Sequence, residues 1–230
     1  MKHLISYSLY GHNPRYTVGA IKNAILIQKY PYFTARFYVG ETVPDWVVST
    51  LRLLPNVEIV EMMATEDFRA MFWRFYALAD LDYDYVLVRD VDARLNDREI
   101  DMHYEFVESG KSFHIIKDHP TGHSYTISGG LLAAKKAAVH DIHKLMDAWS
   151  PKPAYGNDIE FLTRMVYIKV KDDCLVHDEY YNTPGSIKSR TKKKHTLDMV
   201  GAAVNEDDLY IYDNDAERSL DETGSRYHRV

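Results

Sequence analysis

The chain has 230 residues, of which 46% are hydrophobic and 27% are charged. This composition is typical of a globular domain with a substantial core, and it excludes a collagen-like, low-complexity or mainly disordered protein. With 28 basic and 34 acidic residues the formal net charge is −6, which argues against a protein that coats nucleic acid or an anionic membrane. The single cysteine, Cys174, excludes an internal disulfide and a cysteine-based zinc site and is typical of a reducing compartment.

The sequence shows no targeting or membrane-spanning pattern. The opening MKHLISYSLY is too short and too polar for the apolar core of a signal peptide, and no later stretch stays apolar for long enough to cross a bilayer. We therefore expect a cytoplasmic protein with no membrane span. From the negative net charge we also expect no nucleic-acid partner.

The first half of the chain alternates strand and helix patterns. Hydrophobic spacing predicts strands at residues 3–9, 35–39 and 57–60, and helices at residues 17–30 and 45–54. A further helix carries Phe68, Phe72 and Phe75 and is expected to be capped by Thr65. The continuous apolar run at residues 85–88 then predicts a central parallel strand covered on both faces.

The second half continues this alternation less regularly. The expected helices lie at residues 98–109, 136–149 and 157–168, and the expected strands at 113–116 and 127–134. Short connections and repeated strand–helix alternation predict a single α/β domain, Rossmann-like, whose mostly parallel central sheet is flanked by helices. Ligands of such sheets bind beyond the carboxyl ends of the strands.

Two aspartates follow the apolar strand at residues 85–88. Asp90 and Asp92 are two residues apart, so in extended backbone both carboxylates point into one crevice, an arrangement suited to a hard divalent cation. The same D-x-D spacing occurs at residues 80–82, 82–84 and 213–215, and spacing alone therefore does not identify a metal site. The apolar strand before Asp90 and Asp92 favours a metal site at this pair, because a buried strand should not end in two like charges without a compensating cation or hydrogen bonds.

The sequence lacks the glycine-rich motifs that hold phosphates in other nucleotide enzymes. Neither G-x-G-x-x-G after the first strand nor G-x-x-x-x-G-K-[ST] is present, which disfavours a dinucleotide oxidoreductase or a P-loop enzyme. Mn²⁺ or Mg²⁺ could instead bridge the two aspartates to a diphosphate. The candidate third ligand is His177, which follows the short apolar run at residues 174–176.

Five segments in fixed order carry a family resemblance: RDVDARL, FHIIKDHP, SGGLLAAK, YGNDIEFL and LVHDEYY. Together they resemble glycosyltransferases of the GT-A fold, including small sugar transferases of bacteria and large algal viruses, over residues 6–177. The resemblance implies that a hexose-type sugar moves from a UDP-sugar donor to a hydroxyl of a glycan or glycoconjugate, with Mn²⁺ or Mg²⁺ bound. It also implies a nucleotide-binding half at residues 1–95, a sugar and acceptor half at 96–200, and an acidic tail at 201–230.

The resemblance also implies roles for individual residues. The implied metal ligands are Asp90, Asp92 and His177, and the implied catalytic residues are Asp158 and Asp118, which engage the donor sugar and the reacting centre. The implied donor-binding residues are Ser6, Tyr7, Leu9, Tyr10, Arg74, Arg89, Asp90, Gly129 and Gly130. The motif order favours retention of configuration, although Ile159 stands where relatives commonly have glutamine after the aspartate.

Most of these candidates have a structural alternative. Asp90 and Asp92 could cap the following turn, Asp118 could begin the His119-Pro120 turn, and Asp158 could cap the helix that it begins. His177 could be a core or surface residue, Arg74 could pack along Trp73, and the two glycines could mark a bulge. The basic run at residues 188–194 could be a solvated loop, a lid over the diphosphate, or a patch for an acidic acceptor.

Other functions stay open at this point. A sugar nucleotidyltransferase should carry a glycine-rich loop with Lys or Arg after its first strand, which residues 10–13 match poorly. A D-x-D phosphatase would need Thr or Ser and Lys motifs that the sequence lacks. A catalytically silent sugar- or nucleotide-binding protein would bind its ligand without dependence on a metal.

Overall fold

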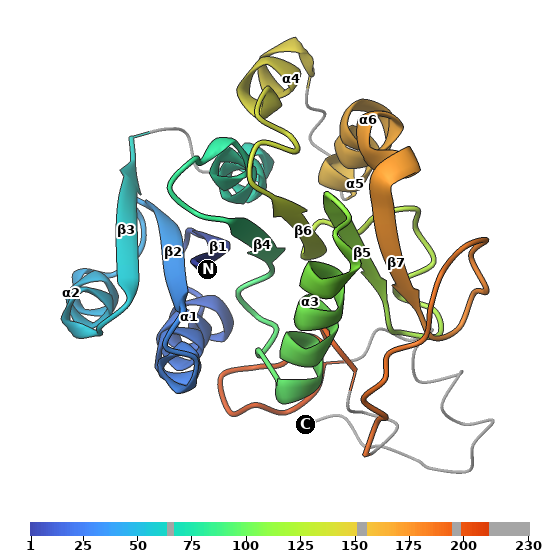
Figure 1. Cartoon of the computed structure of the whole chain (residues 1–230). Helices are drawn as coiled ribbons and strands as arrows, with labels where there is room; N and C mark the ends of the chain where they lie inside the picture. Colours follow the sequence, from blue (N-terminus) through green and yellow to red (C-terminus); the bar gives the residue numbers. More distant parts are fainter. Residues whose placement is uncertain (64–66, 151–155, 195–198, 212–230) are drawn as a thin grey trace.

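Apolar runs of five to eight residues form the strands of one central sheet. The computed structural model describes residues 1–63, 67–150, 156–194 and 199–211. In these ranges seven strands pair in the order β3-β2-β1-β4-β6-β5-β7 (Figure 1). Their bounds are β1 His3–Leu9, β2 Phe33–Gly40, β3 Val57–Met62, β4 Tyr85–Arg89, β5 Phe113–Lys117, β6 Leu131–Lys135 and β7 Cys174–Asp178.

The sheet is mixed but mostly parallel, as the sequence predicts. Strand β6 alone runs antiparallel to both of its neighbours, β4 and β5, within the described sheet, and the other pairs are parallel. Because β4 and β6 run in opposite directions, the end of β4 lies beside the start of β6. Arg89 pairs with Leu131 in this register, which brings Asp90 next to the two glycines that precede β6.

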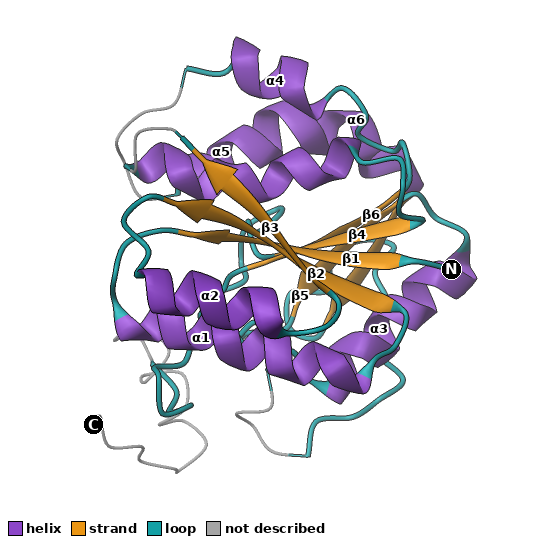
Figure 2. Ribbon diagram, turned by 90° about the vertical axis from the view of Figure 1, so that its left-hand side faces the viewer, coloured by secondary structure: helices purple, strands orange, loops and turns teal. Residues whose placement is uncertain are grey.

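Helices cover both faces of the sheet (Figure 2). The α-helices are α1 Pro14–Leu26, α2 Asp45–Leu53, α3 Asp97–Ser109, α4 Ile142–Ala148, α5 Asn157–Phe161 and α6 Ile168–Val170. Tighter 3-10 segments are η1 Ile27–Lys29, η2 Phe68–Ala79 and η4 Lys171–Asp173, and η3 Leu162–Tyr167 has π-helical hydrogen bonding. None of the described helices is long and apolar enough to cross a membrane.

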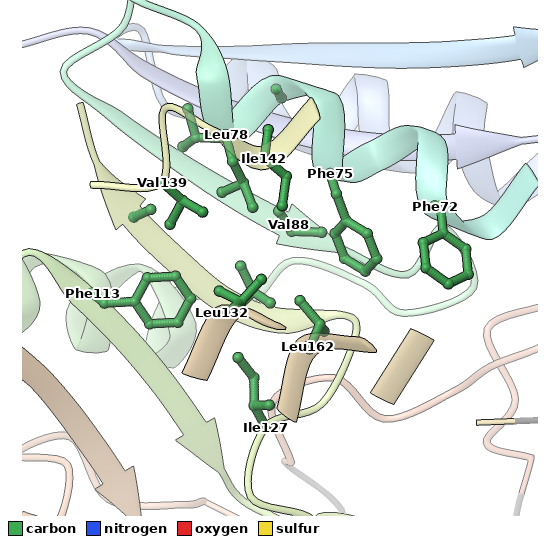
Figure 3. Packing of buried hydrophobic residues seen from close by; sticks show 14 of the residues in the cluster. Phe72, Phe75, Leu78, Val88, Phe113, Ile127, Leu132, Val139, Ile142 and Leu162 are labelled. Carbon is green, nitrogen blue, oxygen red and sulfur yellow. The ribbon is translucent and has the colours of Figure 1, made fainter. Parts of the chain in front are cut away.

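Two hydrophobic clusters fill the spaces between sheet and helices. One lies between the sheet and η2, α4, α5 and η3, and it includes Phe72 and Phe75 of η2, Leu162 of η3 and Leu132 of β6 (Figure 3). The other lies on the opposite face and joins α1, α2 and α3 to the sheet. Strand β4 contributes to both clusters, which explains its uninterrupted apolar sequence.

Several helix boundaries differ from the sequence prediction for local reasons. The helix expected at residues 136–149 begins only at Ile142, because Ala137 has a φ of 66° that interrupts a helix. The helix expected at 17–30 begins earlier, at Pro14, where the Asn13 side chain accepts a hydrogen bond from the backbone of Arg15. The strand expected at 127–134 is confined to β6. The expected cap Thr65 lies outside the described residues, and Asp67 caps η2.

A layer of buried histidines lies between α3 and the sheet. His103 of α3 hydrogen-bonds His3 of β1 at 2.9 Å, and His114 of β5 hydrogen-bonds His177 of β7 at 2.7 Å. Burial holds the pKa of His103 and of His114 well below the usual range, and it lowers the pKa of His3 to about 4. These imidazoles are therefore neutral in the folded protein at pH 7.

We expect the free energy of unfolding to fall as the pH drops below 6.5. The unfolded chain binds protons at histidines near pH 6.5 while the folded chain does not, so each strongly shifted histidine removes about 1.4 kcal/mol per pH unit below that value. Urea unfolding at pH 7, 6 and 5 measures the effect. The exposed His140 provides a control, since His140→Gln should leave the slope unchanged. A free energy of unfolding that is constant from pH 7 to 5 would contradict the assignment.

Candidate active site

A cleft of about 670 Å³ opens where β1 and β4 end. Because the two strands are adjacent and parallel, the residues after them meet at one edge of the sheet. Segments from both halves of the chain line the cleft. Its polar and aromatic lining includes Ser8, Tyr10, Arg15, Tyr16, Arg74, Asp90, Asp92, His123, Tyr125, Ser128 and Asp158.

A buried arginine joins two of the predicted site carboxylates. Arg74, on η2, pairs through Nη1 with Asp90 and through Nη2 with Asp158 at 2.9 Å. Burial disfavours its charge, but Asp90 and Asp158 outweigh that effect and raise the pKa of Arg74 above its usual value. The guanidinium therefore stays charged and fixes the two carboxylates, which come from distant parts of the chain, on one side of the cleft.

Two serines of β1 hold the backbone of Arg74 in place. Ser6 donates a hydrogen bond to the Arg74 carbonyl at 2.8 Å, and the Ser8 hydroxyl accepts one from the Arg74 amide at 3.0 Å. Ser8 also donates to the carbonyl of Met71 at 3.3 Å. These bonds attach η2 to the sheet exactly where its arginine enters the cleft, so β1 positions the guanidinium indirectly.

Gly129 and Gly130 leave room for these carboxylates. A Cβ atom at Gly129 would overlap the Asp158 carboxylate and lie 2.6 Å from Nη2 of Arg74. A Cβ atom at Gly130 would overlap the Asp90 carboxylate and lie 2.8 Å from the Asp90 amide. Neither glycine has a positive φ, so the requirement at both positions is space rather than backbone conformation.

The second aspartate of the D-x-D motif has its own arginine. Asp92 is largely buried and pairs with Nη2 of Arg15, the second residue of α1. Burial and then the charge of Asp90 raise the pKa of Asp92, and Arg15 opposes both effects. The two aspartates therefore lie close enough to repel each other, and each is compensated by one guanidinium.

The donor set at this point suits a hard divalent cation in part. Asp90 and Asp92 offer carboxylate oxygens beside a water-accessible cleft, and the Asp90 side chain is 49% exposed. Within the described residues no group of three or more His, Cys, Asp or Glu side chains could hold a metal. Mg²⁺ and Mn²⁺ are often bound by one or two carboxylates with water and phosphate oxygens as the other ligands, and the pair fits that pattern.

His177 does not lie with the two aspartates, and its assignment as third metal ligand is wrong. It is fully buried in β7, where Nδ1 hydrogen-bonds His114 and Nε2 lies 3.3 Å from Glu105 of α3. Strands β6 and β5 separate β7 from β4, a distance of about 14 Å at roughly 4.8 Å per strand. Both ring nitrogens are used within the histidine layer.

Asp118 is also placed outside the cleft, which contradicts its prediction as a catalytic residue. Its carboxylate has no solvent exposure and pairs with Arg98 and, at 2.9 Å, with Lys193. It also accepts a hydrogen bond from the amide of Val200 at 2.8 Å. Asp118 therefore anchors the segment after residue 199, and Lys193 of the basic run is held by that anchor rather than free to act as a lid.

Several predicted donor-binding residues are core residues instead. Tyr7 and Leu9 point into the cluster beneath α1 and α2, where Tyr7 stacks on Phe37 with ring centroids 5.0 Å apart. Ser6 acts only on the backbone of Arg74, and Tyr10 does line the cleft. Arg89 is buried in a pair with Glu99 and donates to the Gly130 carbonyl at 3.2 Å. It supports the glycine pair from below and makes no contact with the cleft.

The structure adds cleft residues that the sequence did not reveal. Arg15 and Tyr16 come from the first turn of α1, and Gly201 and Ala203 come from a segment expected to be part of the acidic tail. Asp208 in this segment pairs with Lys22 and with Arg94, each at 2.8 Å. The apolar runs at residues 199–204 and 209–211, on either side of the acidic residues 206–208, were the available signal for a packed rather than a solvated segment. Residues 212–230 lie outside the described part.

Comparison with solved structures shows a GT-A fold. S. aureus TarS 1-349 in complex with UDP matches with a TM-score of 0.55 at 15% identity, over 79% of this chain and 59% of that one. The galactosyltransferase LgtC, in complex with donor and acceptor sugar analogues, matches with a TM-score of 0.50 at 12% identity, over 76% and 73%. The chain thus spans about three fifths of the TarS fragment.

A nucleotidyltransferase shares the architecture. The 4-diphosphocytidyl-2C-methyl-D-erythritol synthase from Anaerococcus prevotii matches with a TM-score of 0.52 at 12% identity, over 84% of this chain and 91% of that one. No family model matches the chain, and no curated protein matches it in sequence. The expected fold class is confirmed, and the activity has to be argued from the cleft.

Gly130→Ala tests the packing of the glycine pair against the aspartates. The added Cβ atom should displace Asp90 and reduce the free energy of unfolding by about 1–3 kcal/mol through overpacking, and it should also weaken nucleotide binding. Thermal unfolding and UDP titration measure the two effects. Gly110→Ala is the control, because its φ of 71° costs stability without any nearby atom and should leave UDP binding unchanged. Normal stability and binding in Gly130→Ala would show that the overlap is relieved without consequence.

Proposed function

We propose that the protein is a metal-dependent glycosyltransferase that moves a hexose-type sugar from a UDP-sugar to a hydroxyl group of a glycan or glycoconjugate. The observation that carries the proposal is the Asp90–Arg74–Asp158 cluster at the carboxyl edge of the sheet. It places a fixed cation and two carboxylates in one cleft with a second aspartate–arginine pair beside it. Support also comes from the shared fold of LgtC and of UDP-bound TarS.

The two ends of the cleft suit the two parts of such a donor. Tyr10 and Tyr16, from the first half of the chain, offer aromatic surface for a nucleoside, and burial keeps both phenols neutral by raising their pKa. Gly129 and Asp158, from the second half, lie at the other side of Arg74. We assign the nucleotide to residues 1–95 and the sugar and acceptor to residues 96–200, with residues 201–204 closing the cleft.

The need to compensate negative charge determines the role that we assign to each charged residue of the cleft. A diphosphate brings negative charge to a cleft that already contains Asp90, Asp92 and Asp158, so bound cations must offset it. Asp90 and Asp92 would hold Mn²⁺ or Mg²⁺, which when bound acts as a Lewis acid toward the departing diphosphate. Arg74 orients Asp90, stays charged in the buried site, and keeps Asp158 directed at the sugar.

Asp158 is the residue that we assign to the reacting centre. It is 7% exposed at the start of α5, lines the cleft, and is fixed by Arg74 at 2.9 Å. A fixed carboxylate beside the sugar stabilises positive charge that develops at the anomeric carbon, which retaining and inverting transfers both require. Our assignment of retention rests on the order of the sequence motifs. Ile159 lines the cleft directly after it and supplies no amide.

A sugar nucleotidyltransferase is the second candidate, and the similar synthase structure favours it. The loop after β1 contains Gly11 and leads into Arg15, but it is not rich in glycine. The products separate the two activities. With UDP-sugar and Mn²⁺, a glycosyltransferase releases UDP, whereas a nucleotidyltransferase run in reverse consumes pyrophosphate and releases UTP.

Mn²⁺ and UDP should stabilise the protein cooperatively. If both occupy the same cleft, the melting temperature with Mn²⁺ and UDP together should exceed the sum of the separate shifts, because each ligand then raises the affinity of the folded protein for the other. Differential scanning fluorimetry measures this. Asp92→Asn should abolish the excess shift, and Asp82→Asn, in a D-x-D pair outside the cleft, should keep it. Additive shifts in the unmodified protein would argue against a shared site.

Asp158→Asn should reduce turnover far more than it reduces UDP affinity. The amide keeps the shape of the side chain but removes the charge needed beside the reacting sugar, so we expect kcat to fall by at least about a hundredfold, on the scale of other lost electrostatic stabilisers. A screen of UDP-sugars with Mn²⁺ identifies the donor, and UDP release measures the rate. Equal losses of turnover and of UDP affinity would make Asp158 a binding residue.

A further inference from the structure

Arg15 lines the cleft, and its guanidinium group is not needed to form the helix that carries it. It follows Pro14 at the start of α1, and the helix start is already fixed by Pro14 and by the side chain of Asn13. Its side chain is 28% exposed and reaches across the cleft to Asp92. The start of the helix therefore does not need this guanidinium. Among the described residues, the guanidinium pairs with Asp92 and lies over the neighbouring ring of Tyr16, whose centroid is 5.3 Å from the guanidinium carbon.

Among the described residues, each of the two cleft arginines has one N–H donor that makes no hydrogen bond. Within the described residues, the Nε atoms of Arg15 and Arg74 are buried and make no hydrogen bond. A buried donor without an acceptor is costly, and such groups are commonly satisfied by a ligand or by water. Both donors belong to side chains that line the same cleft, and arginine binds an acceptor-rich anion such as a diphosphate through paired N–H groups.

The charges of the cleft favour a transfer of Arg15 from Asp92 to the diphosphate when a divalent cation is bound. Asp90, Asp92 and Asp158 carry three negative charges, and Arg15 and Arg74 carry two positive ones. A diphosphate would add negative charge to a cleft without spare positive charge. A divalent cation at Asp90 and Asp92 would supply that charge and would replace the guanidinium at Asp92.

We propose that Arg15 is an exchangeable counterion: it occupies Asp92 while the cleft contains no cation, and it moves to the diphosphate when Mn²⁺ or Mg²⁺ takes its place. This inference rests on the proposed function and names a second diphosphate-binding residue for it. Arg15 then competes with the cation for Asp92 but cooperates with it in binding the nucleotide. Cation and nucleotide affinity should consequently respond to its removal in opposite directions.

Arg15→Gln separates these two roles. Without the guanidinium, Asp92 is free, and Mn²⁺ alone should bind roughly three- to tenfold more tightly, as expected for loss of a competing ion pair at a partly exposed site. UDP in saturating Mn²⁺ should bind roughly tenfold or more weakly, since a charge-assisted contact to the diphosphate is lost. Isothermal titration calorimetry with Mn²⁺ alone and then with UDP measures both constants. Arg15→Lys should recover part of the UDP affinity because the charge is kept.

Arg52→Gln is the matched control. Arg52, on α2, is an exposed arginine paired with Glu61 far from the cleft lining, and its substitution should change neither constant. Unmodified protein that binds neither Mn²⁺ nor UDP would overturn the proposed function and this inference with it. If the unmodified protein binds both, and Arg15→Gln leaves both constants unchanged or weakens both, the inference alone is wrong. An unchanged unfolding midpoint in Arg15→Gln would confirm that the helix does not depend on Arg15.

Discussion

The buried guanidinium of Arg74 is the constraint on which the rest of the cleft depends. A cation in a site of low dielectric is tolerated only with charged partners and a fixed backbone. Asp90 and Asp158 provide the partners, and the serines of β1 provide the fixed backbone. The lack of side chains at Gly129 and Gly130 follows from the same constraint, because both carboxylates need the space that a Cβ atom would fill.

The mixed sheet makes this cluster possible. A fully parallel sheet would place the start of β6 at the far edge, away from the end of β4. Because β6 runs antiparallel, its preceding glycines arrive beside Asp90, and the second half of the chain is brought to the edge where β1 and β4 end. Two carboxylate–arginine pairs then lie side by side in one cleft. This arrangement places four charged side chains in fixed positions at one edge of the sheet.

The sequence predicts the site best where a strand pattern and a chemical pattern coincide. The apolar run before Asp90 located the end of β4, and Asp90 and Gly129 line the cleft while Gly130 packs against Asp90. The predicted approach of a donor sugar to the two glycines stays a prediction. His177 was misassigned because a short apolar strand gives no information about its place in the sheet, and β7 is separated from β4 by two strands. Asp118 was misassigned because its partners Arg98 and Lys193 are distant in sequence.

The opening strand shows a different limit. Ser6 and Ser8 face η2 while Tyr7 and Leu9 face the other cluster, which follows from the two-residue period of a strand. The two-residue alternation along the strand could separate the serines from Tyr7 and Leu9. It could not predict which of the two faces lies toward the cleft. Arg15 left no such signal, since a polar residue in the first turn of a helix is ordinary. Its role depends on a contact with Asp92 that spans 77 residues.

The segment after residue 199 closes the cleft from far along the chain. The Val204 amide donates to the Asp92 carbonyl at 2.8 Å, and Arg94 donates to the carbonyl of Asn205, 111 residues later. During synthesis, β4 and the D-x-D segment that follows it can therefore fold against their neighbours before residues 199–211 have left the ribosome. In a chain that is still being synthesised, the cleft would therefore lack this side until residues 199–211 have emerged.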